Sequence, residues 1–262
     1  MSLNCKTPED VAKAIAENDV RHVDLRFTDP RGKWQHLTQV PETIDDDAYT
    51  DGIFFDGSSI AGWRAINESD MTMIPDPVTA VMDPFTQQPT LILICDVHDP
   101  VTGEQYSRDP RSTAKRAEAH LKGTGIGDTA FFGPEPEFFV FDDVRYDVSM
   151  SNTFYSIDEE EGPYNTGRNY EGGNIGHRPP AKGGYFPVPP VDSHADLRAE
   201  MITVMAEMGV STEKHHHAVA PSQNELGMEF STLLKTADAV QIYKYVVHNV
   251  AHSYGKTATF MP

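Results

Sequence analysis

The sequence is poor in cysteine, in long apolar runs and in basic residues, and each shortage excludes a class of protein. Only two of its 262 residues are cysteines, Cys5 and Cys95, too few for a disulfide scaffold and in keeping with a reduced, cytoplasmic setting. No apolar stretch approaches the ~20 residues of a membrane span, and the first residues lack the features of a signal peptide. Lys and Arg number 21 against 40 Asp and Glu, so binding to nucleic acid or to a membrane is not expected.

The sequence does contain enough apolar material for one large folded domain or two modest ones. Hydrophobic residues make up 39% and aromatic residues 10%, which is too many for a disordered acidic chain. The net charge of −19 therefore serves either solubility, which is its ordinary use, or the binding of hard cations.

The first part of the chain predicts a sheet with one or two helices. Thr7-Pro8-Glu9-Asp10 combines an N-cap, a proline at the first helical position and an acid three residues after the cap, so a short helix should end near Asn18. The alternation over 22–27 and the return over 34–40 predict a hairpin. The acidic stretch 41–51 is expected to be a solvated loop.

The turn-rich stretch 96–111 is interpreted as a domain boundary, and the chain after it mixes helices and strands. Helices are expected over 112–122, with Ser112 as the cap, and over 192–208 and 238–254; strands are expected over 131–141 and, in two pieces, over 210–230. The stretch 142–190 shows no period and is expected to be a functional or disordered loop. The fold class expected from this mixture is α+β.

Two glutamates, Glu135 and Glu137, stand two residues apart in the apolar segment 131–141. On a strand, residues two apart project from the same face, so two carboxylates would lie side by side. Two carboxylates at such a short distance repel each other unless a cation binds between them. Oxygen ligands favour Mg²⁺ or Mn²⁺ over zinc. The alternative is a pair of exposed acids on an edge strand, which the neighbouring prolines would also allow.

A second polar cluster is the run Glu213-Lys214-His215-His216-His217-Ala218, with Glu225 after a turn. Three consecutive histidines suggest zinc, but on a strand only His215 and His217 share a face, and no cysteine lies nearby. The alternative is a polar strand with one packed or hydrogen-bonded histidine. The residues alone leave both interpretations open.

Two turn-like segments are further candidates. Asp56-Gly57-Ser58-Ser59 could bind a small cation, although capping of a helix is the commoner explanation of such a sequence. Lys182-Gly183-Gly184-Tyr185-Phe186-Pro187 lacks the spacing of a Walker phosphate loop and is interpreted as a glycine-hinged loop with an aromatic tip, either a mobile lid or plain disorder.

Together these segments resemble bacterial type I glutamine synthetase. The matching stretches lie at 55–60, 66–70, 133–139, 182–190 and 255–262, and they span nearly the whole chain. Each motif alone would be weak, but chance agreement of all of them in order is not credible.

The resemblance implies an N-terminal β-grasp domain over 19–103 and a catalytic domain over 111–262, built on a curved antiparallel sheet with helices and incomplete at its C-terminus. It implies ATP-dependent ligation of glutamate and ammonium to glutamine through γ-glutamyl phosphate, with Mg²⁺ or Mn²⁺ as cofactor. Divalent ions would neutralise the transferring phosphoryl group, and a buried acid would hold ammonium. It also implies self-association into a dodecamer of two hexameric rings.

Site residues carry over from the resemblance position by position. For the metal ions, Glu137 and Glu225 match ligands of one ion and Glu135 matches a ligand of the second. For the nucleotide, the matching positions are Glu213, His216 and Phe230. For ammonium, they are Asp56, Ser59 and Tyr185, with Asp56 acting across a subunit contact. Trp63 matches an aromatic near the nucleotide region, and a packing role is equally compatible.

Two departures from the family pattern lead us to expect that the 262-residue chain alone is inactive. The family has an acid at the position of Ala218, a metal ligand whose loss leaves Glu137 and Glu225 to hold one ion. Family chains also continue past Pro262 into further metal ligands and substrate-binding arginines. The alternatives are a non-catalytic fragment or relative that binds metal or nucleotide weakly, and a ligase that joins glutamate to another amine. The intact Asp56 turn argues against the latter.

Overall fold

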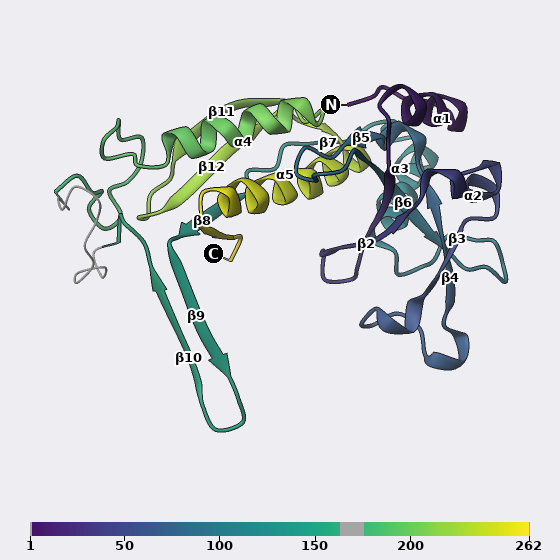
Figure 1. Cartoon of the computed structure of the whole chain (residues 1–262), viewed down its shortest axis with the longest axis horizontal. Helices are drawn as coiled ribbons and strands as arrows, with labels where there is room; N and C mark the ends of the chain where they lie inside the picture. Colours follow the sequence, from purple (N-terminus) through teal and green to yellow (C-terminus); the bar gives the residue numbers. More distant parts are fainter. Residues whose placement is uncertain (1, 163–175, 262) are drawn as a thin grey trace. The chain divides into compact units, whose positions relative to one another are not determined.

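A computed structural model describes residues 2–162 and 176–261 of the chain (Figure 1). They form two compact units, each considered by itself below. Unit 1 comprises Met1–Phe132, Glu207–Gly209 and Ser231–Gln241, and unit 2 comprises Gly133–Ala206, Val210–Phe230 and Ile242–Pro262. In the described ranges no helix is both long and apolar enough to cross a bilayer.

Unit 1 is built on a mixed sheet. Its strands are β1 (His22–Thr28), β2 (Trp34–Gln39), β3 (Ile53–Asp56), β4 (Asp70–Pro75), β5 (Val81–Met82) and β6 (Thr90–His98). They run in the order β2-β1-β6-β4-β3, with β5 beside β6, and β1 and β6 are parallel while the other pairs are antiparallel. The β1–β2 hairpin is as predicted. Alternating residues of β1 and β6, such as Leu25 and Leu93, are fully buried and form the core of this unit.

The helices of unit 1 show how their caps determine where they begin. In α1 (Pro8–Glu17) the Thr7 side chain accepts from the Asp10 backbone N–H, which confirms the predicted capping box. The helix α2 (Asp46–Thr50) lies where a solvated loop was predicted, and that prediction was wrong. The Asp45 side chain caps α2, and acids in its first turn suit the positive end of the helix dipole. Short 3-10 turns cover Pro41–Thr43, Gly57–Ser59, Ile66–Glu68 and Pro77–Thr79.

Helix α3 (Pro110–Thr124) begins earlier than predicted, because Asp109 and not Ser112 is its cap. The Asp109 carboxylate accepts from the backbone N–H groups of Arg111 and Ser112, and Pro110 occupies the first turn. The helix ends at Gly125, whose φ of 69° is accessible to glycine at little cost.

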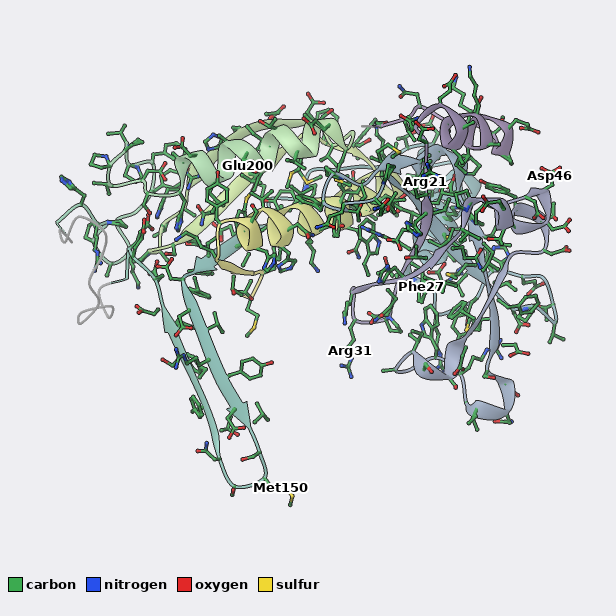
Figure 2. All side chains as sticks on the ribbon, in the orientation of Figure 1. Arg21, Phe27, Arg31, Asp46, Met150 and Glu200 are labelled. Carbon is green, nitrogen blue, oxygen red and sulfur yellow. The ribbon has the colours of Figure 1, made fainter. Side chains whose placement is uncertain are left out.

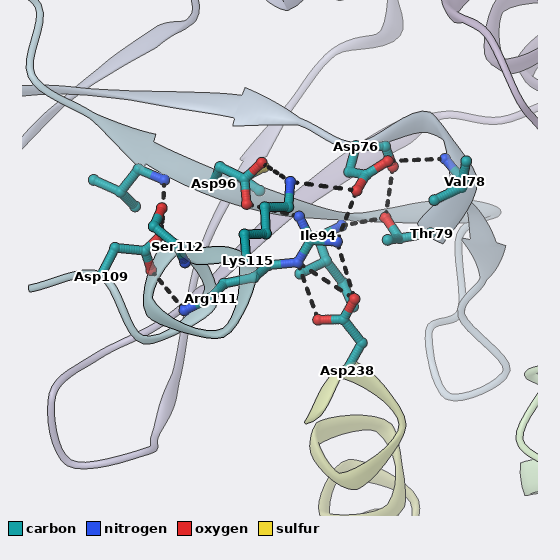
Figure 3. A network of polar contacts seen from close by, with 12 residues as sticks. Asp76, Val78, Thr79, Ile94, Asp96, Asp109, Arg111, Ser112, Lys115 and Asp238 are labelled. Carbon is teal, nitrogen blue, oxygen red and sulfur yellow. Dashed lines mark hydrogen bonds and ion pairs between the residues drawn. The ribbon is translucent and has the colours of Figure 1, made fainter. Parts of the chain in front are cut away.

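A buried ion network surrounds Arg111 within unit 1 (Figure 3). Its guanidinium donates to Asp96 at 2.7 Å, to Asp76 at 2.7 Å and to both carboxylate oxygens of Asp238 at 3.0 Å and 3.3 Å. Lys115 is ion-paired with Asp96 and lies 3.9 Å from Asp76. Two cations thus face three carboxylates, and the network joins α3 to β6, to the Pro77–Thr79 turn and to the first part of α5 (Leu233–Ser253).

Unit 2 contains a four-stranded antiparallel sheet in the order β11-β12-β8-β14. The strands are β8 (Glu137–Phe141), β11 (Thr212–His217), β12 (Gln223–Met228) and β14 (Thr257–Thr259). The helices are α4 (Ala195–Glu207) and the part of α5 that begins at Ile242. The strand pair over 210–230 and the glycines that stop the two helices are as predicted, while α5 begins at Leu233 rather than 238. Phe138, Met201, Leu226 and Tyr243 are fully buried in this unit.

The predicted continuous strand over 131–141 is interrupted. Phe131–Phe132 forms β7, which pairs with β13 (Ser231–Thr232), and β8 begins only at Glu137. Pro134 and Pro136 have no N–H to donate to a strand ladder, so Gly133–Pro136 lies outside the sheet. Glu135 is therefore not on a strand with Glu137, and the argument that placed both on one strand face was wrong.

The stretch 142–190 contains an antiparallel hairpin, which was not predicted. It consists of β9 (Asp143–Val148) and β10 (Thr153–Asp158), with Met150 at its tip (Figure 2). Most residues of both strands are exposed or half-buried. In β9, Val144, Tyr146 and Val148 alternate with polar residues, a strand period that the prediction of a loop overlooked. Residues 163–175 of this stretch lie outside the described residues.

Candidate functional site

Three polar side chains lie in register across neighbouring strands of the unit 2 sheet. His216 on β11 is opposite Glu225 on β12, and Glu225 is opposite Glu137 on β8. Residues directly opposite each other project from the same face of a sheet, so these three form one row, called here the cross-strand row. The His216 Nε2 atom lies 3.3 Å from Glu225 Oε2, and Glu137 Oε2 accepts from Gln223 Nε2 at 2.7 Å.

The two carboxylates of the row are the donor type that hard divalent cations prefer. Like charges directly opposite each other destabilise a strand pair, so a cation bound between Glu225 and Glu137 would stabilise the pairing of β12 with β8. Within the described ranges, however, no group of three or more His, Cys, Asp or Glu side chains is arranged to hold a metal. Ala218, which the resemblance matches to a metal-binding acid, is 1% exposed and supplies no side-chain oxygen. The residues present therefore fit a metal only in part.

The remaining predicted metal and nucleotide residues of unit 2 lie outside the row. Glu135 is exposed in the segment Gly133–Pro136. Glu213 is exposed at an irregularity of β11, where the register with β12 shifts. Phe230 is 68% exposed and lies beside Gly133: a Cβ built on Gly133 would lie 3.6 Å from the Phe230 Cβ.

Tyr185 is brought beside the row by the loop 182–187. Its ring stacks on that of Phe186 with centroids 3.9 Å apart, and both rings meet the His216 imidazole edge-on, at 5.5 Å and 4.7 Å. Both side chains are more than half exposed, which leaves aromatic surface next to His216. The loop thus has the predicted aromatic tip, and the tip lies at one end of the row.

The other face of β11 carries a buried ion pair that the sequence did not single out. His217 Nε2 lies 2.7 Å from Glu161 Oε2, and both side chains are almost fully buried. Burial alone would raise the pKa of Glu161, but the hydrogen bond from His217 and the nearby His194 outweigh it and lower that pKa to about 2. Burial would lower the pKa of His217, but the Glu161 carboxylate raises it. In the sequence, Glu161 is only the last acid of the run Asp158–Glu161, so no pattern identified it.

The three consecutive histidines therefore have three different environments. His216 faces Glu225 in the row, His217 is paired with Glu161, and His215 Nδ1 lies 3.3 Å from the Arg198 Nε atom. This arrangement supports the packed, hydrogen-bonded interpretation for His217 and provides no zinc cluster in the described part of the chain.

In unit 1, the Asp56 carboxylate is held by its own turn. Its Oδ1 atom accepts from the Ser58 N–H at 2.8 Å and the Ser58 hydroxyl at 2.6 Å, and its Oδ2 atom accepts from the Ser59 hydroxyl at 2.9 Å. The Ser58 hydroxyl and then the Ser59 hydroxyl lower the pKa of Asp56, so the exposed carboxylate is charged at neutral pH. A Cβ on Gly57 would lie 2.3 Å from the Met71 sulfur, so this turn requires glycine.

Trp63, the other aromatic singled out in unit 1, is a packing residue. It is 6% exposed, and its ring stacks on Phe27 at 5.3 Å and meets Tyr106 edge-on at 5.5 Å. Phe55 lies 6.1 Å away in the same cluster. Trp63 matched either an aromatic near the nucleotide region or a packing residue, and the structure shows it in the packing role.

Two family models match the chain along most of its length. The glutamine synthetase β-grasp domain matches residues 19–100, and the glutamine synthetase catalytic domain matches residues 107–262. The fold is accordingly an α+β arrangement of a β-grasp domain followed by a catalytic domain. The chain belongs to the glutamine synthetase family.

Individual relatives and one solved structure are similar to nearly the whole chain. A glutamine synthetase from Azospirillum brasilense is 65% identical over 248 residues, which cover 95% of this chain and 53% of the relative. A 3-hydroxylaminophenol mutase from Cupriavidus pinatubonensis is 56% identical over 254 residues, covering 97% of this chain and 54% of the relative. The cryo-EM structure of Plasmodium falciparum glutamine synthetase superposes with a TM-score of 0.91 at 26% identity, covering 100% of this chain and 51% of that one. The chain spans about half the length of these relatives.

Proposed function

We propose that the protein carrying this chain joins glutamate and ammonium to glutamine at the expense of ATP, by way of γ-glutamyl phosphate. The observation that carries the proposal is the cross-strand row, which brings three residues matched to the family's metal and nucleotide sites side by side on three adjacent strands. Phosphoryl transfer depends mainly on positioning and on charge neutralisation, and such a row of fixed polar groups suits both needs.

The cofactor proposal concerns Mg²⁺ or Mn²⁺. Glu137 and Glu225 would bind one ion, and Glu135 would contribute to the second. Bound ions would neutralise the transferred phosphoryl group and polarise the glutamate carboxylate. For ATP, the proposed contacts are the His216 imidazole, which is already beside Glu225, together with Glu213 and Phe230, whose ring is exposed enough for a base to stack on it.

The ammonium proposal concerns Asp56, Ser59 and Tyr185. A carboxylate that stays charged at neutral pH attracts the ammonium cation. Ammonium must lose a proton before its nitrogen can attack, and Asp56 is proposed to hold it where that proton is lost. The amine nitrogen attacks the acyl carbon of γ-glutamyl phosphate, the C–N bond forms, and the C–O bond to phosphate breaks. Asp56 is proposed to serve the site of a neighbouring copy of the chain, as the family resemblance implies.

Self-association is therefore part of the proposal, and the β9–β10 hairpin supports it. Tyr146, Val148 and Tyr155 are each more than 70% exposed, and Met150 at the tip is fully exposed (Figure 2). Four exposed apolar side chains on one hairpin are typical of a surface that contacts another protein. An isolated two-stranded hairpin is also only marginally stable in water. A second copy would bury these side chains.

The experiment that tests the activity compares Glu225→Gln with a matched control, Glu207→Gln, in the complete protein. Glu207 is exposed at the end of α4, so its change removes one charge from a side chain that has no proposed role. Glutamine formation from glutamate, ammonium and ATP with Mg²⁺ should fall about 100-fold or more in Glu225→Gln and stay near the original rate in the control. Unchanged activity in Glu225→Gln, or no activity in the unmodified protein, would refute the proposal.

A further inference from the structure

The Glu161 carboxylate gathers hydrogen bonds from three separate segments of unit 2. Its Oε1 atom accepts from the Ser193 N–H at 3.2 Å and the Ser193 hydroxyl at 2.6 Å. Its Oε2 atom accepts from the Ser222 N–H at 2.7 Å and faces His217 Nε2 at 2.7 Å. With 1% of its surface exposed, Glu161 is a buried charge, and each of these four contacts can donate a hydrogen bond to its carboxylate.

His217 completes this arrangement as a cation. Its Nε2 atom faces the Glu161 carboxylate, and its Nδ1 atom faces the Ala218 carbonyl oxygen at 2.6 Å. Neither a carboxylate nor a carbonyl can donate a hydrogen bond, so both ring nitrogens must carry a proton. A doubly donating imidazole is an imidazolium ring with a single allowed orientation.

The glycine loop rests on this fixed ring. A Cβ built on Gly184 would lie 2.8 Å from His217 Cε1 and 3.0 Å from its Nδ1, so the loop backbone lies directly against the imidazole. The Gly184 N–H donates to the Val219 carbonyl at 2.9 Å, and the Phe186 N–H donates to the His217 carbonyl at 3.4 Å. Only a residue without a side chain allows this approach.

The same loop carries the aromatic pair that meets His216. Tyr185 and Phe186 follow Gly184 directly, and their rings contact the His216 imidazole from outside while the Gly184 backbone is held by His217. Ser222, in the turn that leads into β12, has a φ of 57° and is held through its N–H by Glu161. The ion pair therefore fixes both the loop and the turn between β11 and β12, two of the three strands of the row.

We propose that the buried Glu161–His217 ion pair is a positioning device that sets the loop 183–187, and with it the Tyr185–Phe186 pair, against His216 of the cross-strand row. Neither Glu161 nor His217 touches the proposed substrates; both act through the loop. The consequence for catalysis rests on the proposed function, but the placement of the loop does not.

Hydrogen exchange of the loop amides tests the placement without any turnover. In the full chain, Glu161→Gln replaces a group that accepts from every neighbour by one that must present an N–H to a donor. Exchange in a peptide spanning 183–187 should speed up by roughly tenfold or more, while exchange in β6 of unit 1 should not change. The exposed control Glu207→Gln should leave both peptides as they are.

A second variant keeps the test decisive if Glu161→Gln fails to fold. Gly184→Ala leaves the ion pair intact but places a methyl group against the His217 ring, so the loop must move and its exchange should accelerate similarly. Nitrogen-15 NMR of labelled histidine should also show both ring nitrogens of His217 protonated at neutral pH, a signature lost in Glu161→Gln. Loop exchange within about twofold of the original in a folded variant would overturn the proposal.

Turnover in the complete protein separates this inference from the proposed function. If glutamine is formed, Glu161→Gln should reduce kcat more than tenfold while the conservative Glu161→Asp recovers part of the loss. If no glutamine is formed but the loop exchange responds as described, the positioning role stands and the proposed function fails. If glutamine is formed and neither variant alters loop exchange, the positioning role fails alone.

Discussion

The ion network around Arg111 gives a prediction whose sign and size follow from counting charges. Two cations, Arg111 and Lys115, face the carboxylates of Asp76, Asp96 and Asp238, and the Arg111 side chain is only 5% exposed. Arg111→Met leaves one lysine to balance three buried or half-buried carboxylates. Removing one partner from a buried ion pair costs about 3–5 kcal/mol, because the charges left behind are not compensated.

Asp238→Asn should be much milder. Burial raises the pKa of Asp238 despite its bidentate contact with Arg111, so its charged form is already disfavoured where it lies. The change leaves two cations and two carboxylates, and an amide oxygen can still accept from Arg111. We expect a loss of about 1 kcal/mol.

Urea unfolding measures both variants directly. Both tryptophans, Trp34 and Trp63, belong to unit 1, so their fluorescence reports the unit that holds the network. Arg21→Met, at an exposed arginine of the same unit, is the matched control and should cost less than about 0.5 kcal/mol. The reasoning is refuted if Asp238→Asn destabilises as much as Arg111→Met, or if Arg111→Met resembles the control.

Three other predictions concern unit 2 and the site. The pKa of Glu161 is lowered from 4.5 to about 2, so the stability that its charged form contributes should be complete above about pH 4.5. About 3 kcal/mol of that stability should be lost as the pH falls toward 2. Urea unfolding of Glu161→Gln across this pH range should not show the loss, and equal pH slopes for the two proteins would contradict the assignment. Because the pKa of His217 in the same pair is raised, its contribution should be complete below the ordinary histidine pKa of about 6.5 and be lost as the pH rises from there through the raised value. Ala218→Glu, which adds a third carboxylate to the proposed ligands Glu137 and Glu225, should tighten Mn²⁺ binding about 10–100-fold by calorimetry, and equal affinity would remove this position from the proposed site. Purified chain 1–262 should form no glutamine in a coupled ADP assay, and robust turnover would show that the residues present suffice.

Local signals in the sequence predicted much of the fold. The capping box at Thr7, the hairpin of β1 and β2, the strand pair around Pro221 and the glycine stops at Gly209 and Gly255 all depend on neighbouring residues, which a sequence displays directly. The errors arose where local rules compete. Asp109 and Ser112 are both good caps, and only the proline at the next position favours the former.

The site was predictable in part for the same reason. Glu137, Glu225 and His216 lie on three different strands, and their alignment depends on strand register, which no short motif displays directly. The motif resemblance supplied their identity, and the structure supplied their adjacency. Glu161 was missed because its role comes from burial and from donors at Ser193, His217 and Ser222, far along the chain from it. Nothing local distinguishes it from its acidic neighbours.

Divalent-ion binding by the cross-strand row tests the central claim most directly. Titration of Mn²⁺ into the chain, followed by electron paramagnetic resonance, compares the original sequence with Glu225→Gln and with the control Glu207→Gln. If the row holds a cation, affinity should fall about tenfold or more in Glu225→Gln and remain unchanged in the control. Equal affinity in all three proteins would contradict the claim that this row is the metal site.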